Sequence, residues 1–397
     1  MTTLTNQTPK GLSRLWRNKE SRGVIIQIIT MAIVFALLAA IGRNVVVNLE
    51  AVGKDFSFDF LSWPAAYDIG FSPFIEYTNK STHLMAGVVG LLNTLLIAFW
   101  GCILATLLGF LLGIMRLSSN WLVSRISYVF VEFVRNVPVL IHILAIYAIV
   151  VTILPATRQA LSLGGDTFFL SNRGFYIPAP IYETGAGWVG IVLLISIALA
   201  IGFKRWARRV QDQTGKIYPV FWISLVLLIG LPGIALIGTG FPISWDIPEL
   251  KGFNFQGGMA IKPEFLALWL GLSYYTAAFI AEIVRAGITA VSHGQTEAAH
   301  ALGLRPNRTL QLIIVPQALR IIVPPLCSQY LNLTKNSSLA IAIGYMDITA
   351  TLGGISLMQT GKEMETMLIV MGVYLIISLL ISSFMNWFNS RIKLTER

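Results

Sequence analysis

The chain has 397 residues, of which 55% are hydrophobic and only 12% are charged, and its formal net charge is +10. That charged share is about half of the share in an ordinary soluble domain, so the composition excludes a soluble globular protein. Long apolar runs recur that can each cross a hydrocarbon layer roughly 30 Å thick, which predicts a polytopic membrane protein. In such a chain the positive charge reports membrane orientation, and we expect no nucleic-acid partner.

The first apolar run, residues 24–42, lacks a small-residue cleavage site. We therefore expect a stable membrane anchor there and not a cleaved signal peptide. The two cysteines, Cys102 and Cys327, both lie inside apolar runs. Neither a disulfide framework nor a metal centre is predicted from them.

Eight membrane spans can be drawn in chain order, which predicts an all-α integral membrane fold. Their ends can shift by several residues. They cover residues 24–42, 86–115, 135–155, 187–203, 217–239, 263–287, 318–344 and 366–387. The three longest connections are rich in Gly, Pro and aromatic residues, which is typical of ordered caps outside the membrane. These connections are residues 43–83, 156–186 and 240–262.

Basic residues are unevenly divided between the two sides of these spans. With the N-terminus placed inside, the inner segments carry Lys10, Arg14, Arg17, Lys19, Arg22, Arg116, Arg125, Lys204, Arg205, Arg208, Arg209, Lys216, Arg305, Arg308, Arg320, Arg391, Lys393 and Arg397. The outer loops hold eight basic residues, diluted by acids such as Asp55, Asp59, Asp68, Glu76, Asp246 and Glu249. Because inner loops are enriched in Lys and Arg, this asymmetry predicts that both termini are cytoplasmic.

A polar stretch, residues 294–320, separates two of the predicted spans. Ser292 followed three residues later by Gln295 predicts a capping box, so a short helix would begin near residue 293. It would end at Gly303, a residue suited to a left-handed helix C-terminus. Small alanines and one glutamate on such a helix fit a docking element for an arginine-bearing partner. The pattern alone equally fits an ordinary solvated loop helix.

The spacing in this stretch resembles a known signature. Glu297, Ala298 and Ala299 are followed after three residues by Gly303, and after nine more by Ile313, Ile314, Val315 and Pro316. This resembles the EAA signature of ABC-importer permeases, EAA-x3-G-x9-I-x-LP, with Val315 in place of Leu. The resemblance implies that Glu297, Ala298, Ala299, Gly303 and Pro316 form a coupling segment that binds a separate ATPase subunit.

Further segments resemble polar amino-acid permeases. "YTAAFIAEIVRAGI" at 275–288 is similar to their A-E-x-x-R-G-G segment, with Ala286 where Gly is usual. "VEFVRNVPVLI" at 131–141 is similar to F-R-G-T-P-L-L, with Asn136 and Val137 replacing Gly and Thr. "PQALRIIVPPL" and "LTKNSSLAIAIG" match as well. The resemblance covers residues 86–155 and 263–390 and is strongest to the membrane subunits of general L-amino-acid importers.

The resemblance implies an architecture for the whole chain. A five-helix type I (MetI-like) transmembrane domain over 86–390 would be interrupted by an insertion at 156–262 that carries a helix pair. Residues 1–85 would add a cytoplasmic tail, one extra helix and a periplasmic loop, and 288–317 would form the coupling segment. The implied location is the bacterial inner membrane. The implied partners are a second, homologous permease in a heterodimer, two copies of the ATPase, a periplasmic amino-acid-binding protein and membrane lipid.

Several polar residues lie within the predicted spans, where charge is costly. Glu282 with Arg285, and Glu132 with Arg135, are three residues apart and are expected to pair on their own helices. The run Lys335, Asn336, Ser337 and Ser338 has groups that suit an amino acid's carboxylate and amine, and Glu282 and Asn136 are added to this candidate substrate path. Glu282 would hold Lys335 if the two spans touch. The alternative is that Lys335 snorkels and the hydroxyls bond within the helix.

The sequence contains no energy-converting motif. The nearest approach to a P-loop, Gly361-Lys362-Glu363, has Ser356 where the first Gly should be and Glu where Ser or Thr is required. We therefore expect a non-enzymatic chain without a cofactor of its own, with ATP and Mg²⁺ used by the partner ATPase. Two alternatives stay open. One is an ABC permease for another polar solute such as an opine, and the other is an ion-coupled secondary transporter, which would need carboxylates at mid-membrane.

Overall fold

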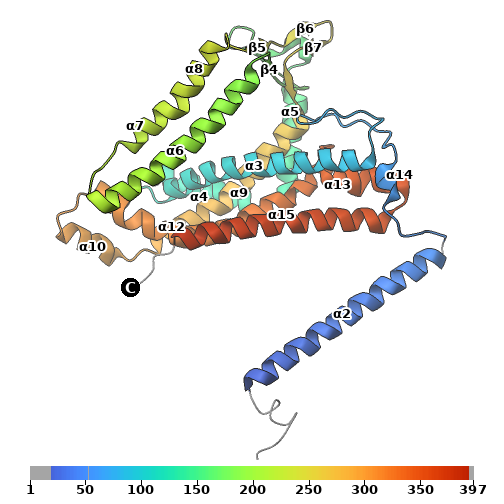
Figure 1. Cartoon of the computed structure of the whole chain (residues 1–397), viewed down its shortest axis with the longest axis horizontal. Helices are drawn as coiled ribbons and strands as arrows, with labels where there is room; N and C mark the ends of the chain where they lie inside the picture. The colour runs from blue at the N-terminus through green and yellow to red at the C-terminus, as the bar shows by residue number, and fades with distance from the viewer. Residues whose placement is uncertain (1–18, 52, 393–397) are drawn as a thin grey trace, which may run out of the picture.

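The structure is a computed structural model that describes residues 19–51 and 53–392. The predicted inner basic residues Lys10, Arg14, Arg17, Lys393 and Arg397 lie outside these ranges. Most of the described chain is helical, and a small group of strands caps one end (Figure 1). We call this end the strand end. The opposite end, where the polar helix α10 (His293–Ala301) lies, is called the α10 end.

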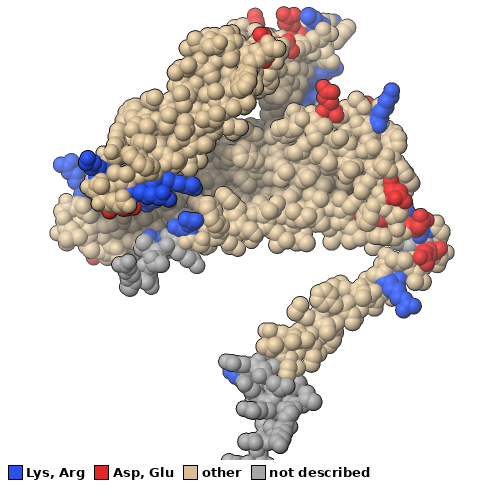
Figure 2. Space-filling model, viewed as in Figure 1, with Lys and Arg blue, Asp and Glu red and all other residues tan. Residues whose placement is uncertain are grey.

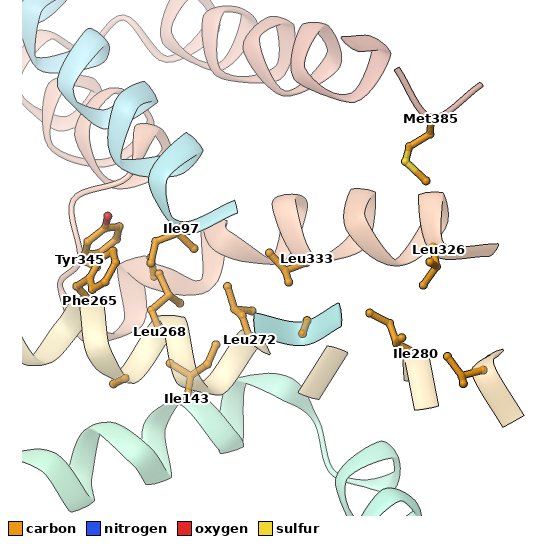
Figure 3. Packing of buried hydrophobic residues seen from close by; sticks show 14 of the residues in the cluster. Ile97, Ile143, Phe265, Leu268, Leu272, Ile280, Leu326, Leu333, Tyr345 and Met385 are labelled. Carbon is orange, nitrogen blue, oxygen red and sulfur yellow. The ribbon is translucent and has the colours of Figure 1, made fainter. Parts of the chain in front are cut away.

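Six helices form the central bundle, in which α3, α9, α12 and α15 run alongside one another (Figure 1). Their bounds are α3 His83–Arg116, α4 Trp121–Asn136, α5 Val139–Ile153, α9 Pro263–Thr289, α12 Val315–Asn336 and α15 Glu363–Ile392. Figure 3 shows the core between them, where Ile97, Leu268, Leu272 and Leu333 point toward one another and are fully buried. The central helix is α9, which contacts α3, α4, α5 and α12.

Glycine makes the crossing of α3 and α9 close. Gly109 and Gly113 form a small-xxx-small pair on α3 and face α9. A Cβ at Gly113 would lie 2.7 Å from the Cβ of Val284, and one at Gly109 would lie 2.5 Å from the Cβ of Ile280. The two backbones therefore approach to a distance that any side chain at these glycines would prevent.

Two further helical regions lie outside this bundle. The first, α2 (Lys19–Ala51), projects away from it in Figure 1. The second is a hairpin in which α6 packs chiefly against α7, η3 and α8, whose bounds are α6 Ala186–Thr214, α7 Val220–Leu225, the π-helical η3 Val226–Gly230 and α8 Leu231–Gly238. The π turn immediately precedes Pro232, whose ring and missing N–H disturb the regular helical ladder.

The strand end is built from both halves of the insertion. A four-stranded antiparallel sheet has the order β1 Leu161–Leu163, β2 Phe168–Ser171, β3 Gly174–Ile177 and β8 Met259–Ile261, in which Tyr176 pairs with Phe169 and Ala260. Two further antiparallel pairs join β4 Ala179–Tyr182 to β5 Ile243–Asp246, across the inserted helices, and β6 Glu249–Lys251 to β7 Asn254–Gln256 in a hairpin. Phe255 of β7 packs on Phe169 and Tyr176, which connects the β6–β7 pair to the sheet. The predicted ordered caps at 156–186 and 240–262 are confirmed, although their strands were not predicted.

The remaining elements are short connections. They are η1 Asp59–Ser62, η2 Thr157–Gln159, α11 Pro306–Thr309, the π-helical η4 Leu310–Ile314, η5 Ser337–Ile343, α13 Ile348–Ala350, the π-helical η6 Thr351–Ser356 and α14 Leu357–Thr360. Helices from α11 to η5 follow one another closely enough to make Pro306–Ile343 a single candidate span of 38 residues.

The predicted spans agree with the structure except at one place. Within the described residues, seven helices are long and apolar enough to cross a membrane, and a bent pair makes an eighth. That pair is α4 and α5, which meet at 105° across Val137 and Pro138. The straight span predicted at 135–155 is therefore wrong, because Pro138 disfavours helical backbone at the residue before it. Helix α4 begins at Trp121, well before the predicted start.

Candidate functional site

The polar helix predicted near residue 293 is α10, and it begins at His293 as expected. The predicted capping box is wrong, because the Ser292 side chain makes no capping hydrogen bond. The Gln295 side chain instead accepts a hydrogen bond from Gln317 Nε2 at 3.2 Å. This bond connects the first turn of α10 to the first turn of α12.

The end of α10 is a left-handed turn at Gly303, whose φ is +78°. Leu304 N–H donates to the Ala299 carbonyl at 3.1 Å, and Gly303 N–H donates to the His300 carbonyl at 2.9 Å. This pair of bonds is a Schellman motif, which satisfies the last carbonyls of the helix. A residue with a Cβ is strained at this φ, so the predicted helix stop at Gly303 is confirmed together with its physical reason.

The faces of α10 differ sharply. Ala299 is 1% exposed and packs inward, whereas Leu302 is 81% exposed and the Glu297 side chain is 72% exposed. Ala298 lies on the exposed side as well. Glu297 Oε1 is 3.0 Å from His293 Nδ1 one turn earlier. The outward face thus presents a carboxylate, a leucine and a small alanine at the end of the molecule, beyond the bundle (Figure 1).

Short linkers connect α10 to two helices of the bundle. Residues 290–292 join it to α9, and residues 302–305 join it to α11 and the long span that follows. Pro316 lies in the first turn of α12, where a missing N–H is tolerated, and Val315 N–H donates to the Leu310 carbonyl in the preceding π turn. Further along, Gly287 of α9 contacts Ile322 of α12. A displacement of α10 would therefore reach both helices near their mutual contact.

Near the α10 end, five charged side chains from α3, α4 and α9 form one cluster. Both predicted pairs are confirmed, with 2.5 Å between Glu282 and Arg285 and 3.6 Å between Glu132 and Arg135. Arg116, at the end of α3, joins the two pairs: it lies 2.5 Å from Glu282 and 3.9 Å from Glu132. Its side chain is only 7% exposed. This role of Arg116 was not predicted, because the residue ends an apolar run and is typical of a basic residue in an inner loop.

The polar run 335–338 lies at the opposite end of α12. Lys335 is exposed, and Asn336 is half-buried beside it. Ser337 Oγ is buried and donates to the Thr334 carbonyl at 2.7 Å, and Ser338 Oγ donates to the Lys335 carbonyl at 2.8 Å. Both hydroxyls thus make the within-helix bonds of the alternative interpretation, although Ser337 Oγ also lies 3.3 Å from Tyr374 OH.

The candidate path residues do not come together. Leu333 packs on Gly101 of α3, whereas Ile280 and Val284 pack on Gly109 and Gly113. Glu282 therefore lies beside a part of α3 that is about ten residues from the part beside Leu333. Ten residues of helix correspond to roughly 15 Å. The expectation that Glu282 holds Lys335 is wrong, because Glu282 is held by arginines near the other end. Asn136 donates from Nδ2 to the Glu132 carbonyl at 2.7 Å, on α4.

A buried polar network near Lys335 was missed by the sequence interpretation. Asp347, in the segment between the spans Pro306–Ile343 and Glu363–Arg391, is fully buried, and burial raises its pKa to about 6. Its carboxylate accepts from Ala350 N–H at 2.8 Å and from Tyr374 OH at 3.1 Å. Tyr345 OH donates to the Asn93 carbonyl of α3 at 3.1 Å. The Asp347–Ala350 bond is local and caps the short helix α13. The other two bonds join residues far apart in the chain, so no local pattern predicts them.

Comparison with known proteins places this arrangement in a family. Residues 194–394 match the family described as binding-protein-dependent transport system inner membrane component. The chain is 46% identical over 376 residues to the general L-amino acid transport system permease protein AapQ of Rhizobium johnstonii, an alignment that covers 95% of this chain and 93% of that protein. It is 45% identical over 392 residues to the putative amino-acid ABC transporter permease protein YhdX of Escherichia coli, covering 98% of each.

A third relative is also an amino-acid permease and matches this chain over nearly its whole length. The glutamate/glutamine/aspartate/asparagine transport system permease protein BztB of Rhodobacter capsulatus is 47% identical over 427 aligned positions, which cover 99% of this chain and 100% of that protein. These matches span the bundle, the inserted hairpin and the strand end together. The chain therefore belongs to the binding-protein-dependent transport system inner membrane component family, as an ABC transporter permease.

Proposed function

We propose that this chain is the membrane-spanning subunit of an ATP-driven importer that translocates L-amino acids delivered by a periplasmic binding protein. The observation that carries the proposal is α10, whose outward carboxylate and alanine lie on a helix joined by short linkers to α9 and to the span Pro306–Ile343. The amino-acid specificity follows from the relatives, which are named as general L-amino acid, amino-acid and glutamate/glutamine/aspartate/asparagine permeases.

In this proposal α10 couples ATP hydrolysis to transport. Glu297 would accept charge-assisted hydrogen bonds from an arginine of a separate ATPase, which are shorter and stronger than neutral ones. Ala298 would let the ATPase backbone approach closely. Closure of two ATPase subunits would displace α10, and its linkers would move α9 and α12 against each other. ATP and Mg²⁺ belong to the ATPase, and this chain contributes no catalytic residue.

The orientation and the partners complete the proposal. The α10 end would face the cytoplasm of a bacterial inner-membrane protein with both termini inside. In Figure 2 Lys and Arg gather at this end over α6, which carries Lys204, Arg205, Arg208 and Arg209, while the middle of the visible face is uncharged, in keeping with enrichment of inner loops in basic residues. A second, homologous permease would complete the pore as a heterodimer, and the binding protein would deliver the substrate at the strand end.

Lys335 is the proposed contact for the substrate carboxylate. It is exposed near the strand end of α12, beside Asn336 and Ser338. An amino acid that crosses the bilayer must exchange its hydration for fixed protein donors and acceptors. The exposed ammonium can provide a cation for this purpose, whereas the Ser337 and Ser338 hydroxyls are already donated to the backbone.

The proposal is tested with the assembled importer reconstituted in vesicles, using Glu297→Lys and Lys335→Met. Glu297→Lys turns an attraction into a repulsion, so we expect ATPase co-purification and amino-acid uptake to fall together by about tenfold or more. Lys335→Met should leave ATPase co-purification unchanged and lower uptake severalfold across a panel of labelled amino acids. The matched control is Glu50→Lys near the end of α2, which is exposed and projects away from the bundle, and it should change neither quantity.

Two outcomes would contradict these assignments separately. Wild-type ATPase binding and uptake in Glu297→Lys would remove α10 as the coupling element. Wild-type uptake of the whole panel by Lys335→Met would mean that Lys335 only snorkels and that the substrate passes elsewhere. Uptake of no amino acid by the wild-type importer would overturn the substrate class itself.

A further inference from the structure

Helix α4 has three distinct faces, whereas an ordinary surface helix has only a buried apolar face and an exposed polar one. The first is buried against α3 and α9 and contains Ser127, Val131 and Val134. The second is apolar and open, and it consists of Leu122, Ile126, Val129, Phe130 and Phe133, all between 39% and 62% exposed. The third is polar and carries Ser124, Arg125 and Tyr128, with Glu132 and Arg135 further along the same face. An amphipathic helix with a basic polar face and exposed Leu, Ile and Phe is typical of helices that lie in a membrane interface.

The direction of α4 agrees with such a position. It meets α5 at 105°, so α4 lies close to the membrane plane when α5 crosses the membrane. Trp121 starts the helix and is 74% exposed. Tryptophan is enriched where lipid headgroups meet the hydrocarbon layer. The geometry therefore places the polar face of α4 at headgroup depth.

An open pocket of about 510 Å³ borders this polar face. It is lined by Arg116, Arg125 and Arg285 together with Trp121, Ser124 and Tyr128, and no acidic residue lines it. Behind the pocket, Glu132 and Glu282 neutralise two of the three cluster arginines Arg116, Arg135 and Arg285. The arginine Arg125 adds a further charge and forms no ion pair within residues 19–51 and 53–392. The local surplus of two positive charges favours an anion.

The pocket continues into an apolar groove. Arg125 also lines this neighbouring groove of about 450 Å³, whose other residues are Leu122, Ile126, Val129, Phe130 and Phe133 of α4. A soluble anion would use the basic pocket alone. A ligand that combines an anionic group with hydrocarbon chains would use both, with Arg125 at the boundary between them.

We infer that this site binds an anionic phospholipid, with its phosphate among Arg116, Arg125 and Arg285 and its acyl chains along the apolar face of α4. Arginine matches phosphate oxygens with paired donors, and the Tyr128 hydroxyl adds a further donor, whereas Ser124 Oγ already donates to the Arg116 carbonyl at 2.9 Å. Basic pockets between membrane helices are a recognised arrangement for lipid headgroups. The inference requires only that the protein resides in a membrane, so it is independent of the transported substrate.

The experiment uses Trp121 as the reporter, with the complete importer in lipid nanodiscs. Brominated lipids quench nearby tryptophan, and the Trp121 signal is the difference between wild type and Trp121→Phe. We expect half-maximal quenching at an about fivefold lower mole fraction of brominated phosphatidylglycerol than of brominated phosphatidylcholine. Arg125→Gln should remove this preference, and Arg125→Lys should restore most of it. The matched control, Arg209→Gln on α6, removes another exposed arginine and should keep the preference.

Four results would overturn the inference. Equal quenching by the two brominated lipids would show that the site does not select anionic headgroups. If Arg125→Gln and Arg209→Gln lose the preference for phosphatidylglycerol equally, the preference depends only on the overall charge of the protein. Relief of quenching by millimolar glycerol phosphate or by a free amino acid would identify a soluble anion as the occupant. Absence of quenching by either lipid would mean that another subunit covers the groove.

Discussion

Helices α9 and α2 are both long enough to cross a membrane, yet they expose very different surfaces. In α9, 61% of the most apolar 18-residue stretch is buried inside the protein, whereas none of the corresponding stretch of α2 is buried. The buried side chains of α9 include small and hydroxyl-bearing ones such as Gly271, Ser273 and Thr276. The exposed side chains of α2 are mainly Ile, Val, Leu and Phe. Small residues let neighbouring helices approach, and large aliphatic ones suit lipid.

The inserted hairpin follows the pattern of α2. The buried share is 11% for α6 and zero for the helical run Val220–Gly238. The bundle therefore buries its contacts chiefly around α9, while the added helices, like α15 at the edge of the bundle with 11% buried, leave their apolar surfaces to lipid or to another subunit. This difference predicts that equal substitutions will have unequal effects in the two regions.

The largest difference is expected at glycines. In Gly113→Leu the new side chain would meet Val284 and the Ala281 carbonyl, at 2.9 Å from its Cβ, so the α3 and α9 backbones must separate. Overpacking of this kind costs about 3 kcal/mol or more, because backbone must move. We expect the amount of monodisperse permease, measured by size-exclusion chromatography of a fluorescent fusion, to fall to below about a tenth of wild type.

The control for that substitution is Gly202→Leu in α6, where no atom lies within 4 Å of the added Cβ. This variant should elute at near the wild-type amount. Similar losses in both variants would show that α6 is as tightly packed as α3, and the distinction between the bundle and the added helices would be lost.

An intermediate difference is expected at ion pairs. Arg116→Met removes the nearly buried arginine that joins Glu282 to Glu132 and leaves these carboxylates less compensated. Such a loss costs about 3 kcal/mol. Lys54→Met removes the ion pair between Lys54, which follows α2, and Glu363. The two side chains are 46% and 53% exposed, so solvent screens the pair and its loss should cost much less. Thermal denaturation in detergent measures the melting temperatures of the two variants, and we expect that of Arg116→Met to be lower. Equal melting temperatures in Arg116→Met and Lys54→Met would contradict this expectation.

The sequence predicted local features well and long-range ones poorly. The stop of α10 at Gly303 follows from a few neighbouring residues, and so do the pairs three residues apart on α4 and α9. The start of α10 was placed correctly, although the capping box on which it was based does not form. The role of Arg116 and the burial of Asp347 depend on contacts between distant helices, which no local pattern encodes. The strands at the strand end are only three or four residues long, too short for an alternating pattern to emerge.

The smallest effect is expected for α2 and is the most informative about its surroundings. Phe35 and Leu38 are 65% and 58% exposed, so the double substitution Phe35→Ala with Leu38→Ala creates no cavity within this chain. The free energy of unfolding of the isolated permease should change by less than about 0.5 kcal/mol.

In Leu272→Ala, by contrast, a fully buried side chain of α9 is truncated, at a cost of about 2 to 5 kcal/mol. A loss above about 1 kcal/mol in the α2 variant would mean that α2 packs on the bundle. The same measurement on the assembled importer then separates lipid from protein as the neighbour, because only a covering subunit would make the truncation costly there.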